Sequence, residues 1–249
     1  MRLRSLTKHI RDQNWFAVLL DFFIVVVGIL IAFQITNWNE ARSNFAEERE
    51  ILRQLSIEFE VIEAGATDSL AFQQNAIAGL TTIAASLDAG ILNENDRALF
   101  EQGLLYGYTI YTSSDRSTVL GEIISSGKSS LLKNKDLLRE LMRYNAYLNE
   151  FASAEDIISE QQTAILPNFT NRFSYDLEQT TLVAGSSFKI AAIGNYDFET
   201  MVKDPAFRNA ADELRQTHMM YTNWRRSIAM QIKEIRILLD AEITGEDTK

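Results

Sequence analysis

An uninterrupted apolar run near the N-terminus constrains this chain more than any other feature of its sequence. It extends from Trp15 to Trp38 and reads WFAVLLDFFIVVVGILIAFQITNW. The 23 residue steps between the two tryptophans, at ~1.5 Å each, give a helix of roughly 35 Å, which matches a bilayer core with its interfacial zones. The run therefore predicts a transmembrane helix over residues 15–38, with Trp15 and Trp38 as anchors at the two membrane interfaces.

A cleavable signal peptide is the competing interpretation of this run. Its apolar stretch would be about 7 to 15 residues long and would end in small residues at a cleavage site. The run observed here is longer and continues into Gln34, Asn37 and Asn39. We therefore predict a retained anchor that contacts the lipid bilayer.

The charges on the two sides of the run differ. Residues 1–14 carry four basic side chains against Asp12 alone, a net charge of +3, whereas the segment after Trp38 is mixed and acidic. Basic flanks stay in the cytoplasm, and no second run of about 18 apolar residues follows. The sequence predicts residues 1–14 as a cytoplasmic flank and residues 39–249 as an exported domain, which lies in the periplasm if the cell has one.

The composition of the exported part favours a helical fold. The chain has no cysteine, so this part must fold by packing alone, and two prolines and eleven glycines in 249 residues leave few helix breakers. Removing the N-terminal +3 from the whole-chain net charge of −10 leaves −13 for residues 15–249, which argues against nucleic acid as a partner. We predict an all-α fold, in which the transmembrane helix continues into an exported bundle with long antiparallel helices.

Apolar residues recur at helical spacing along most of this domain. The first stripe comprises Leu52, Leu55, Phe59, Ile62, Leu70, Ile77, Leu80 and Leu87. We expect a turn over residues 89–95, a helix over 96–111, a third capped at 113–115 and ending near Ser125, and a fourth from residues 134–136 to Pro167.

The last third of the chain combines an irregular segment with a long helix. Residues 180–200 lack helical periodicity and predict a crossover loop. Asp204 and Pro205 then supply a capping carboxylate and a proline for the first turn of a helix that extends to about Ile243. Its seam positions, which repeat every seven residues, are Phe207, Leu214, Tyr221, Ile228 and Ile235, with Ala211, His218, Ile232 and Leu239 between them. This helix can lie antiparallel to the first one and bring the C-terminus back towards the membrane.

Two short patterns near the middle of the chain resemble catalytic motifs but depart from them. Gly121–Ser129, GEIISSGKS, is similar to a phosphate-binding P-loop, yet five residues separate its glycines where the motif needs four. We interpret it as a helix C-terminal glycine followed by another helix. Two serine-x-x-lysine spacings, at Ser125–Lys128 and Ser130–Lys133, lack the companion elements of penicillin-recognising enzymes. The sequence predicts neither a nucleotide partner nor catalytic residues.

The sequence also indicates no metal or cofactor. His9 and His218 are the only histidines, so one chain cannot form a multi-histidine metal site, although carboxylate-only sites remain open. His218 occupies a seam position, which favours a half-buried, hydrogen-bonded structural role. The tyrosines of two clusters either belong to the core or line a ligand pocket: Tyr106, Tyr108 and Tyr111, and Tyr144 and Tyr147.

One face of the membrane helix is a candidate association site. Ala17, Asp21, Gly28 and Ala32 recur at four- and seven-residue steps, and the Gly28-x-x-x-Ala32 spacing lets two helix backbones approach closely. A carboxylate at Asp21, roughly 9 Å inside Trp15, is costly in lipid unless it pairs, protonates or reaches interfacial water. The face predicts association with a second copy or another membrane protein. The alternative for Asp21 is a hydrated residue near the helix end.

Two blocks of the sequence resemble an uncharacterised family of bacterial single-pass membrane proteins. They are VVVGILIAFQITNWNEAR (Val25–Arg42) at the membrane exit and SSGKSSLLKNKDLLRELMRYN (Ser125–Asn145) in the exported domain. The resemblance implies an inner-membrane anchor with an exported helical domain and supplies no activity. Members of that family often have glutamate where this chain has Asp21, a side chain shorter by one methylene group.

These features favour a non-enzymatic, membrane-anchored helical protein. We expect it to act as an oligomeric scaffold or as an accessory subunit of a cell-envelope membrane complex. The alternative is a periplasmic sensor module that binds a small molecule between its helices and signals through a partner.

Overall fold

The computed structural model describes residues 15–109, 115–182 and 189–246. Over these ranges the chain is mainly helical, with six α-helices, one short 3-10 helix and a two-stranded sheet, which confirms the predicted all-α class in its main feature. The chain divides into two compact units, residues 1–50 and residues 51–249.

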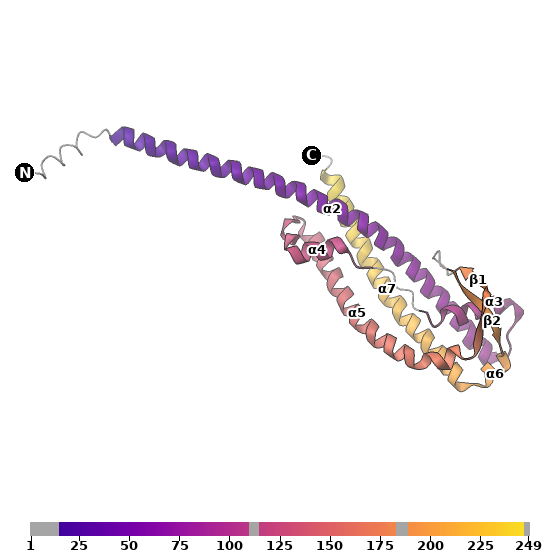
Figure 1. Cartoon of the computed structure of the whole chain (residues 1–249). Coiled ribbons are helices and arrows are strands. Elements are labelled where there is room, and N and C mark those ends of the chain that lie inside the picture. The colour runs from indigo at the N-terminus through magenta and orange to yellow at the C-terminus, as the bar shows by residue number, and fades with distance from the viewer. Residues whose placement is uncertain (1–14, 110–114, 183–188, 247–249) are drawn as a thin grey trace, which may run out of the picture. The chain divides into compact units, whose positions relative to one another are not determined.

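The first unit consists, where it is described, of the N-terminal part of helix α2 (Trp15–Ala89), drawn in indigo in Figure 1. This part is apolar enough and long enough to cross a membrane, and none of its most apolar 18-residue stretch is buried in the fold. Phe22 is 70% exposed and Phe33 is 63% exposed. Within the described residues this is the single helix that meets these criteria.

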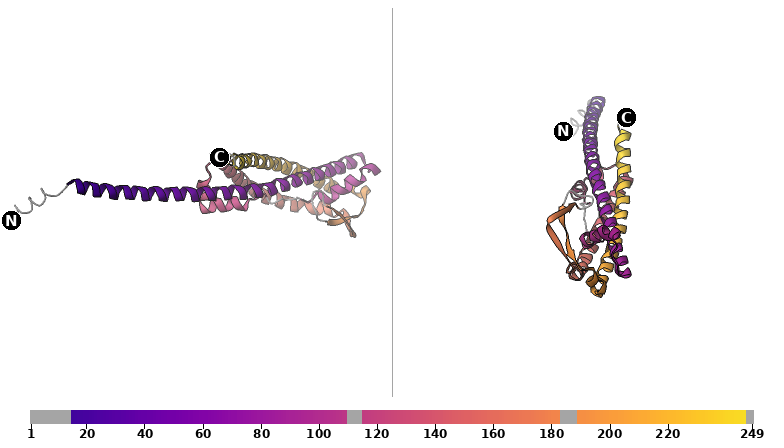
Figure 2. Two further views of the ribbon diagram at one scale, coloured as in Figure 1. Left: turned by 90° about the horizontal axis from the view of Figure 1, so that it is seen from above. Right: turned by 90° about the vertical axis from the view of Figure 1, so that its right-hand side faces the viewer.

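The second unit is a helical bundle formed by the rest of α2 and the elements that follow it (Figure 1, Figure 2). These elements are α3 (Glu94–Tyr106), α4 (Thr118–Ser126), the 3-10 helix η1 (Lys128–Leu131), α5 (Lys135–Thr170), β1 (Phe173–Leu182), β2 (Lys189–Tyr196), α6 (Phe198–Lys203) and α7 (Pro205–Glu246).

Helix α7 is antiparallel to the part of α2 that lies in the second unit. Near the C-terminal end of α7, the Arg236 Nη1 atom donates to the Ser56 carbonyl oxygen at 3.1 Å. Near the N-terminal end of α7, the Arg208 Nη2 atom donates to the Leu87 carbonyl oxygen at 2.9 Å. The end of α7 therefore lies beside the start of the second unit, which confirms the predicted antiparallel arrangement of the long helices.

The core of the second unit follows the predicted stripes. All nine predicted seam positions of α7, from Phe207 to Leu239, are buried. One cluster joins α2, α4, α5 and the C-terminal half of α7 around Phe59, Tyr144 and Ile232. A second joins the end of α2 to α3, α6 and the start of α7 around Phe100 and Phe207. Helical periodicity thus located most of the core, but Leu70 and Ile77 of the first stripe are only partly buried, and Phe72, Ala76 and Ile83 occupy core positions on α2.

Caps explain most helix boundaries. Gly90, with φ +69°, follows the end of α2, and Gly127, with φ +74°, ends α4, so both adopt the left-handed conformation that glycine favours. The N–H of Ala206 donates to the Asp204 carboxylate at 2.9 Å, as predicted for the start of α7. The predicted end of α3 at residue 111 was wrong, because α3 ends at Tyr106. The predicted cap of α4 at 113–115 was also wrong, because Ser117 caps this helix. The positions from 110 to 114 lie outside the described residues.

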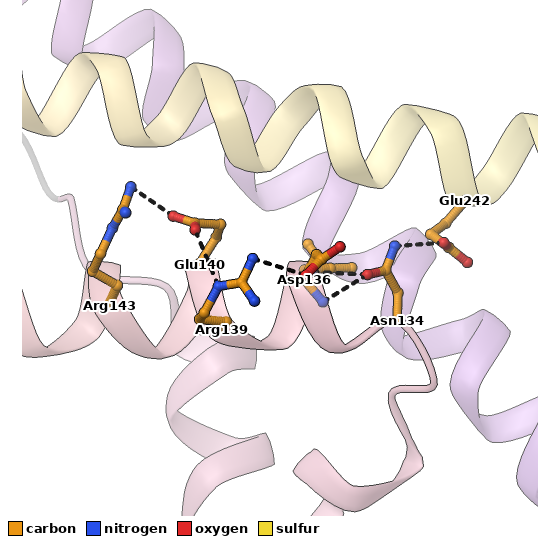
Figure 3. A network of polar contacts seen from close by, with 7 residues as sticks. Asn134, Asp136, Arg139, Glu140, Arg143 and Glu242 are labelled. Atoms are coloured by element: carbon orange, nitrogen blue, oxygen red, sulfur yellow. Dashed lines mark hydrogen bonds and ion pairs between the residues drawn. The ribbon is translucent and has the colours of Figure 1, made fainter.

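Asn134 both caps α5 and connects it to α7 (Figure 3). Its Oδ1 atom accepts hydrogen bonds from the N–H groups of Asp136 and Leu137, each at 2.9 Å, and its Nδ2 atom donates to Glu242 at 2.6 Å. The predicted start of this helix is therefore correct. Its predicted end at Pro167 was wrong, because α5 continues to Thr170. A proline in the last turn removes only one helical hydrogen bond.

The predicted crossover loop at 180–200 was wrong where the structure describes it, because residues 180–182 and 189–196 belong to strands and α6 begins at Phe198, while positions 183–188 lie outside the described residues. Strands β1 and β2 pair in antiparallel fashion with an irregular register, Phe173 lying opposite Tyr196 and Tyr175 opposite Ile193. Phe173, Ile193 and Tyr196 pack against the cluster around Phe100, and the Tyr196 hydroxyl donates to Glu101 at 3.0 Å. Short apolar segments do not distinguish strand from loop until a pairing partner and a packing surface are present.

Candidate functional site

The predicted association face lies on the first unit and is open along its described part. Asp21, Gly28 and Ala32 are exposed, and a Cβ atom added at Gly28 would meet nothing within 4 Å. Trp38 is 66% exposed. The backbones of Trp15 and Ala17 belong to α2, whereas their side chains lie outside the described part of the chain.

A buried ion pair is the main polar feature of the second unit. The guanidinium of Arg225 on α7 contacts the carboxylate of Asp115, which precedes α4, and their side chains are 2% and 6% exposed. The Tyr144 hydroxyl on α5 donates to the Asp115 carbonyl oxygen at 2.5 Å. Burial, followed by the nearby Asp115 carboxylate, raises the pKa of Tyr144 above its ordinary range, so this hydroxyl stays protonated as a donor.

Arg225 also contacts an aromatic cluster. Its guanidinium carbon lies 5.3 Å from the centre of the Phe151 ring, a cation–π distance. The Phe151 ring meets the rings of Tyr221 and Trp224 edge to face, with centroid distances of 5.6 and 4.8 Å. The ion pair thus connects the segment before α4 with α5 and α7.

Glu58 on α2 caps α4 from another helix. Its carboxylate accepts from the Ser117 hydroxyl, from the N–H and hydroxyl of Thr118 at 2.7 and 2.6 Å, and from the Val119 N–H at 3.2 Å. Burial raises the pKa of this carboxyl, but these hydrogen bonds outweigh burial and the pKa lies below its ordinary value. The charge also interacts favourably with the N-terminal end of the α4 dipole.

His218 is structural, as predicted, and more deeply buried than expected. It has no exposed surface, its Nδ1 atom contacts the Gln73 side-chain amide, and its Nε2 atom lies 2.9 Å from the Gly107 carbonyl oxygen. Burial lowers its pKa to about 4, although the hydrogen bond to Gly107 opposes this, so the ring is neutral at pH 7. A neutral imidazole donates through one nitrogen only, so when His218 Nε2 donates to the Gly107 carbonyl oxygen, His218 Nδ1 must accept. Turning the side-chain amide of Gln73 lets Gln73 Nε2, which has no other partner among the described residues, donate to His218 Nδ1.

The segments that resemble a P-loop and the serine-x-x-lysine motif form the end of one helix and the start of the next, as we predicted. Gly127 ends α4 and η1 follows it directly. The hydroxyls of Ser125 and Ser130 donate to the backbone carbonyl oxygens of Glu122 and Gly127 at 3.1 and 3.2 Å. Within the described ranges, no group of three or more His, Asp or Glu side chains is arranged to hold a metal ion.

The tyrosine clusters divide between core and surface. Tyr106 and Tyr144 are buried in the core. Tyr108 accepts a hydrogen bond from the Tyr175 hydroxyl at 2.7 Å, and Tyr147 lines a groove between α5 and α7. Tyr111 lies outside the described residues.

Sequence reasoning missed the Asp115–Arg225 pair and the Glu58 cap. One signal for the pair was present, because Arg225 occurs in the α7 seam between Tyr221 and Ile228, where a charge needs a buried partner. Nothing in the sequence pointed to Asp115 as that partner.

Comparison of the chain with protein-family models, with curated proteins and with solved structures found no match. The residues and their geometry therefore carry the functional argument.

Proposed function

We propose that this chain is a non-enzymatic, single-pass protein of the bacterial inner membrane whose helical bundle lies in the periplasm. It acts there as an oligomeric scaffold or as an accessory subunit of a membrane complex. The observation that carries the proposal is the apolar N-terminal part of α2, of which the most apolar stretch has no buried residue. Such a surface needs lipid or a partner to cover it.

The open face of Asp21, Gly28 and Ala32 supports association within the membrane. In lipid, helices associate through close packing and polar contacts, because the hydrophobic effect does not distinguish a neighbouring helix from the acyl chains. The Thr36 hydroxyl beside this face already has a partner within the helix, because it donates to the Ala32 carbonyl oxygen at 3.1 Å. Asp21 is the ionisable residue of this face, so it gains most from a polar partner on another helix.

The topology is testable in a chain without cysteine. Single cysteines in place of Ser43 and Thr248 are expected to react with an impermeant thiol reagent in intact spheroplasts, and a cysteine in place of Ser5 is not. The reason is the +3 flank, which stays in the cytoplasm. Labelling of Ser5→Cys together with protection of the other two would overturn the proposed orientation.

The association face is testable by crosslinking the full-length protein in membranes. Gly28→Ile is expected to reduce the yield of crosslinked species, because a branched side chain holds two backbones apart. Asp21→Leu should weaken association by ~0.6 to 2 kcal/mol if the carboxyl group bonds across the interface. Val27→Ile, about 100° around the helix, is the matched control and should retain the wild-type yield. Wild-type yield in all three variants would show that lipid covers this face.

A ligand-binding module is the second candidate, and one observation favours it. A groove with a volume of about 90 Å³ lies between α5 and α7 in the second unit. Small-molecule sites often occur between the helices of a bundle.

A further inference from the structure

The groove between α5 and α7 has mostly aromatic walls. On α5 it is lined by Tyr147, Glu150, Phe151 and Ala154, and on α7 by Trp224. The α5 residues occupy positions i, i+3, i+4 and i+7, so successive helical turns present them to the same side. The methyl group of Ala154 leaves the space open. A volume of about 90 Å³ is several times the roughly 10–15 Å³ that one water molecule requires.

The rings that a ligand can reach in this groove are those of Tyr147 and Trp224, which are both partly exposed. Phe151 is 7% exposed and packs edge to face with Trp224, at a centroid distance of 4.8 Å and an interplanar angle of 81°, so it holds the Trp224 ring in place. Aromatic faces carry partial negative charge, and tryptophan attracts cations most strongly of the three aromatic residues. The Arg225 guanidinium, 5.3 Å from the Phe151 ring centre, already makes one such contact within the protein.

The local charge also favours a cation. Asp115 neutralises Arg225 in an ion pair that is almost fully buried. Glu150 lines the groove and is exposed at its rim, and Glu155 on the next turn of α5 accepts a hydrogen bond from the Tyr221 hydroxyl at 3.3 Å. With Arg225 compensated, these two carboxylates outnumber Arg116, a further cation beside this stretch of α5, whose Nη1 atom donates to the Asn149 side-chain oxygen at 3.0 Å.

We propose that this groove binds a quaternary ammonium group. Such a group has no N–H to satisfy, is weakly hydrated, and gains from aromatic faces and from a carboxylate at the rim. The source is either a free small molecule or the choline headgroup of a phospholipid, since both present the same trimethylammonium group. This inference rests on the ligand-binding candidate and is independent of the proposed scaffold role.

The test is a titration of Trp224 fluorescence in the full-length protein. Trp15→Phe and Trp38→Phe leave Trp224 as the single tryptophan, and the protein is placed in nanodiscs of phosphatidylglycerol. Choline is expected to change the emission in a saturable manner. The neutral isostere 3,3-dimethylbutan-1-ol should require a roughly threefold to thirtyfold higher concentration, the range expected for a cation–π contact.

Two variants on α5 test the groove itself. Ala154→Leu fills the space and should abolish the choline response, and Glu150→Gln should weaken it severalfold. Glu160→Gln, an exposed carboxylate on the same helix outside the groove, is the matched control and should match the parent. If the response is already saturated in nanodiscs containing phosphatidylcholine, the headgroup is the source; an unchanged choline response there indicates a free ligand.

The failures are distinguishable. Equal midpoints for choline and its neutral isostere would overturn the ammonium inference but retain a ligand site. The absence of any response, or a full response in Ala154→Leu, would overturn the ligand site as well. Neither result bears on crosslinking through the membrane helix.

Discussion

Replacing Asp115 by asparagine is expected to lower the free energy of unfolding of the bundle by ~3–5 kcal/mol, because the Arg225 charge then stays buried without its compensating carboxylate. Both side chains are almost completely buried, and asparagine keeps the shape of aspartate. For a domain of this size, such a loss corresponds to a decrease of about 6–20 °C in the midpoint of thermal unfolding. Circular dichroism of the full-length protein in detergent measures it.

The matched control is an ion pair between two helices on the surface of the bundle. Arg208 on α7 contacts Asp88 on α2, and their side chains are 36% and 70% exposed. Asp88→Asn removes the same kind of carboxylate, but solvent screens the charge that remains, so the loss should not exceed ~1 kcal/mol. An equal loss of unfolding free energy in Asp115→Asn and Asp88→Asn would contradict the claim that burial makes the unpaired Arg225 charge more costly. Combining Asp115→Asn with Arg225→Met should recover much of the stability, since no unpaired charge is then buried.

Gly103→Ala is expected to destabilise the bundle by ~1–3 kcal/mol, the usual range for overpacking. A Cβ atom at Gly103 would lie 2.5 Å from the Gly79 carbonyl carbon and 2.6 Å from the Gly79 carbonyl oxygen. Gly79→Ala would produce the same clash from the other helix, because its Cβ atom would lie 2.5 Å from the Gly103 Cα atom. Because the obstacle is backbone, α2 and α3 must separate. The same melting experiment measures both variants.

Gly121→Ala on α4 is the matched control for this prediction. A Cβ atom there would meet nothing within 4 Å, so the higher helix propensity of alanine should raise stability by up to ~1 kcal/mol. The two substitutions are chemically identical and are expected to act with opposite sign. A stabilising effect of Gly103→Ala would show that α2 and α3 are farther apart than described.

The predictions that held depend on neighbours within about two helical turns. The seam residues of α7 are buried as their periodicity required, and Asn134 and Asp204 cap the helices that follow them. Helical periodicity and capping act over three to seven residues, so they can be read without knowing the path of the chain. The same applies to the apolar run of α2, because its length and composition are local properties.

The polar contacts that were missed join residues far apart in sequence. Glu58 caps α4 at a separation of 60 residues from Thr118, and the Asp115–Arg225 pair has a separation of 110 residues. The hairpin of β1 and β2 needed both a partner strand and the surface around Phe100 to become more favourable than a loop.

The sequence by itself therefore determined the course of the long helices α2, α5 and α7, most of their buried faces, several caps and the helix with the composition of a membrane span. Only the tertiary structure decided which charge neutralises Arg225, which glycines allow α2 and α3 to meet, and which rings form the groove beside Trp224. The physical reason is that helix formation and amphipathicity arise from neighbouring residues, whereas partner choice depends on the path of the chain. Desolvated charges and close backbone contacts have their energy only after that path has brought the groups together.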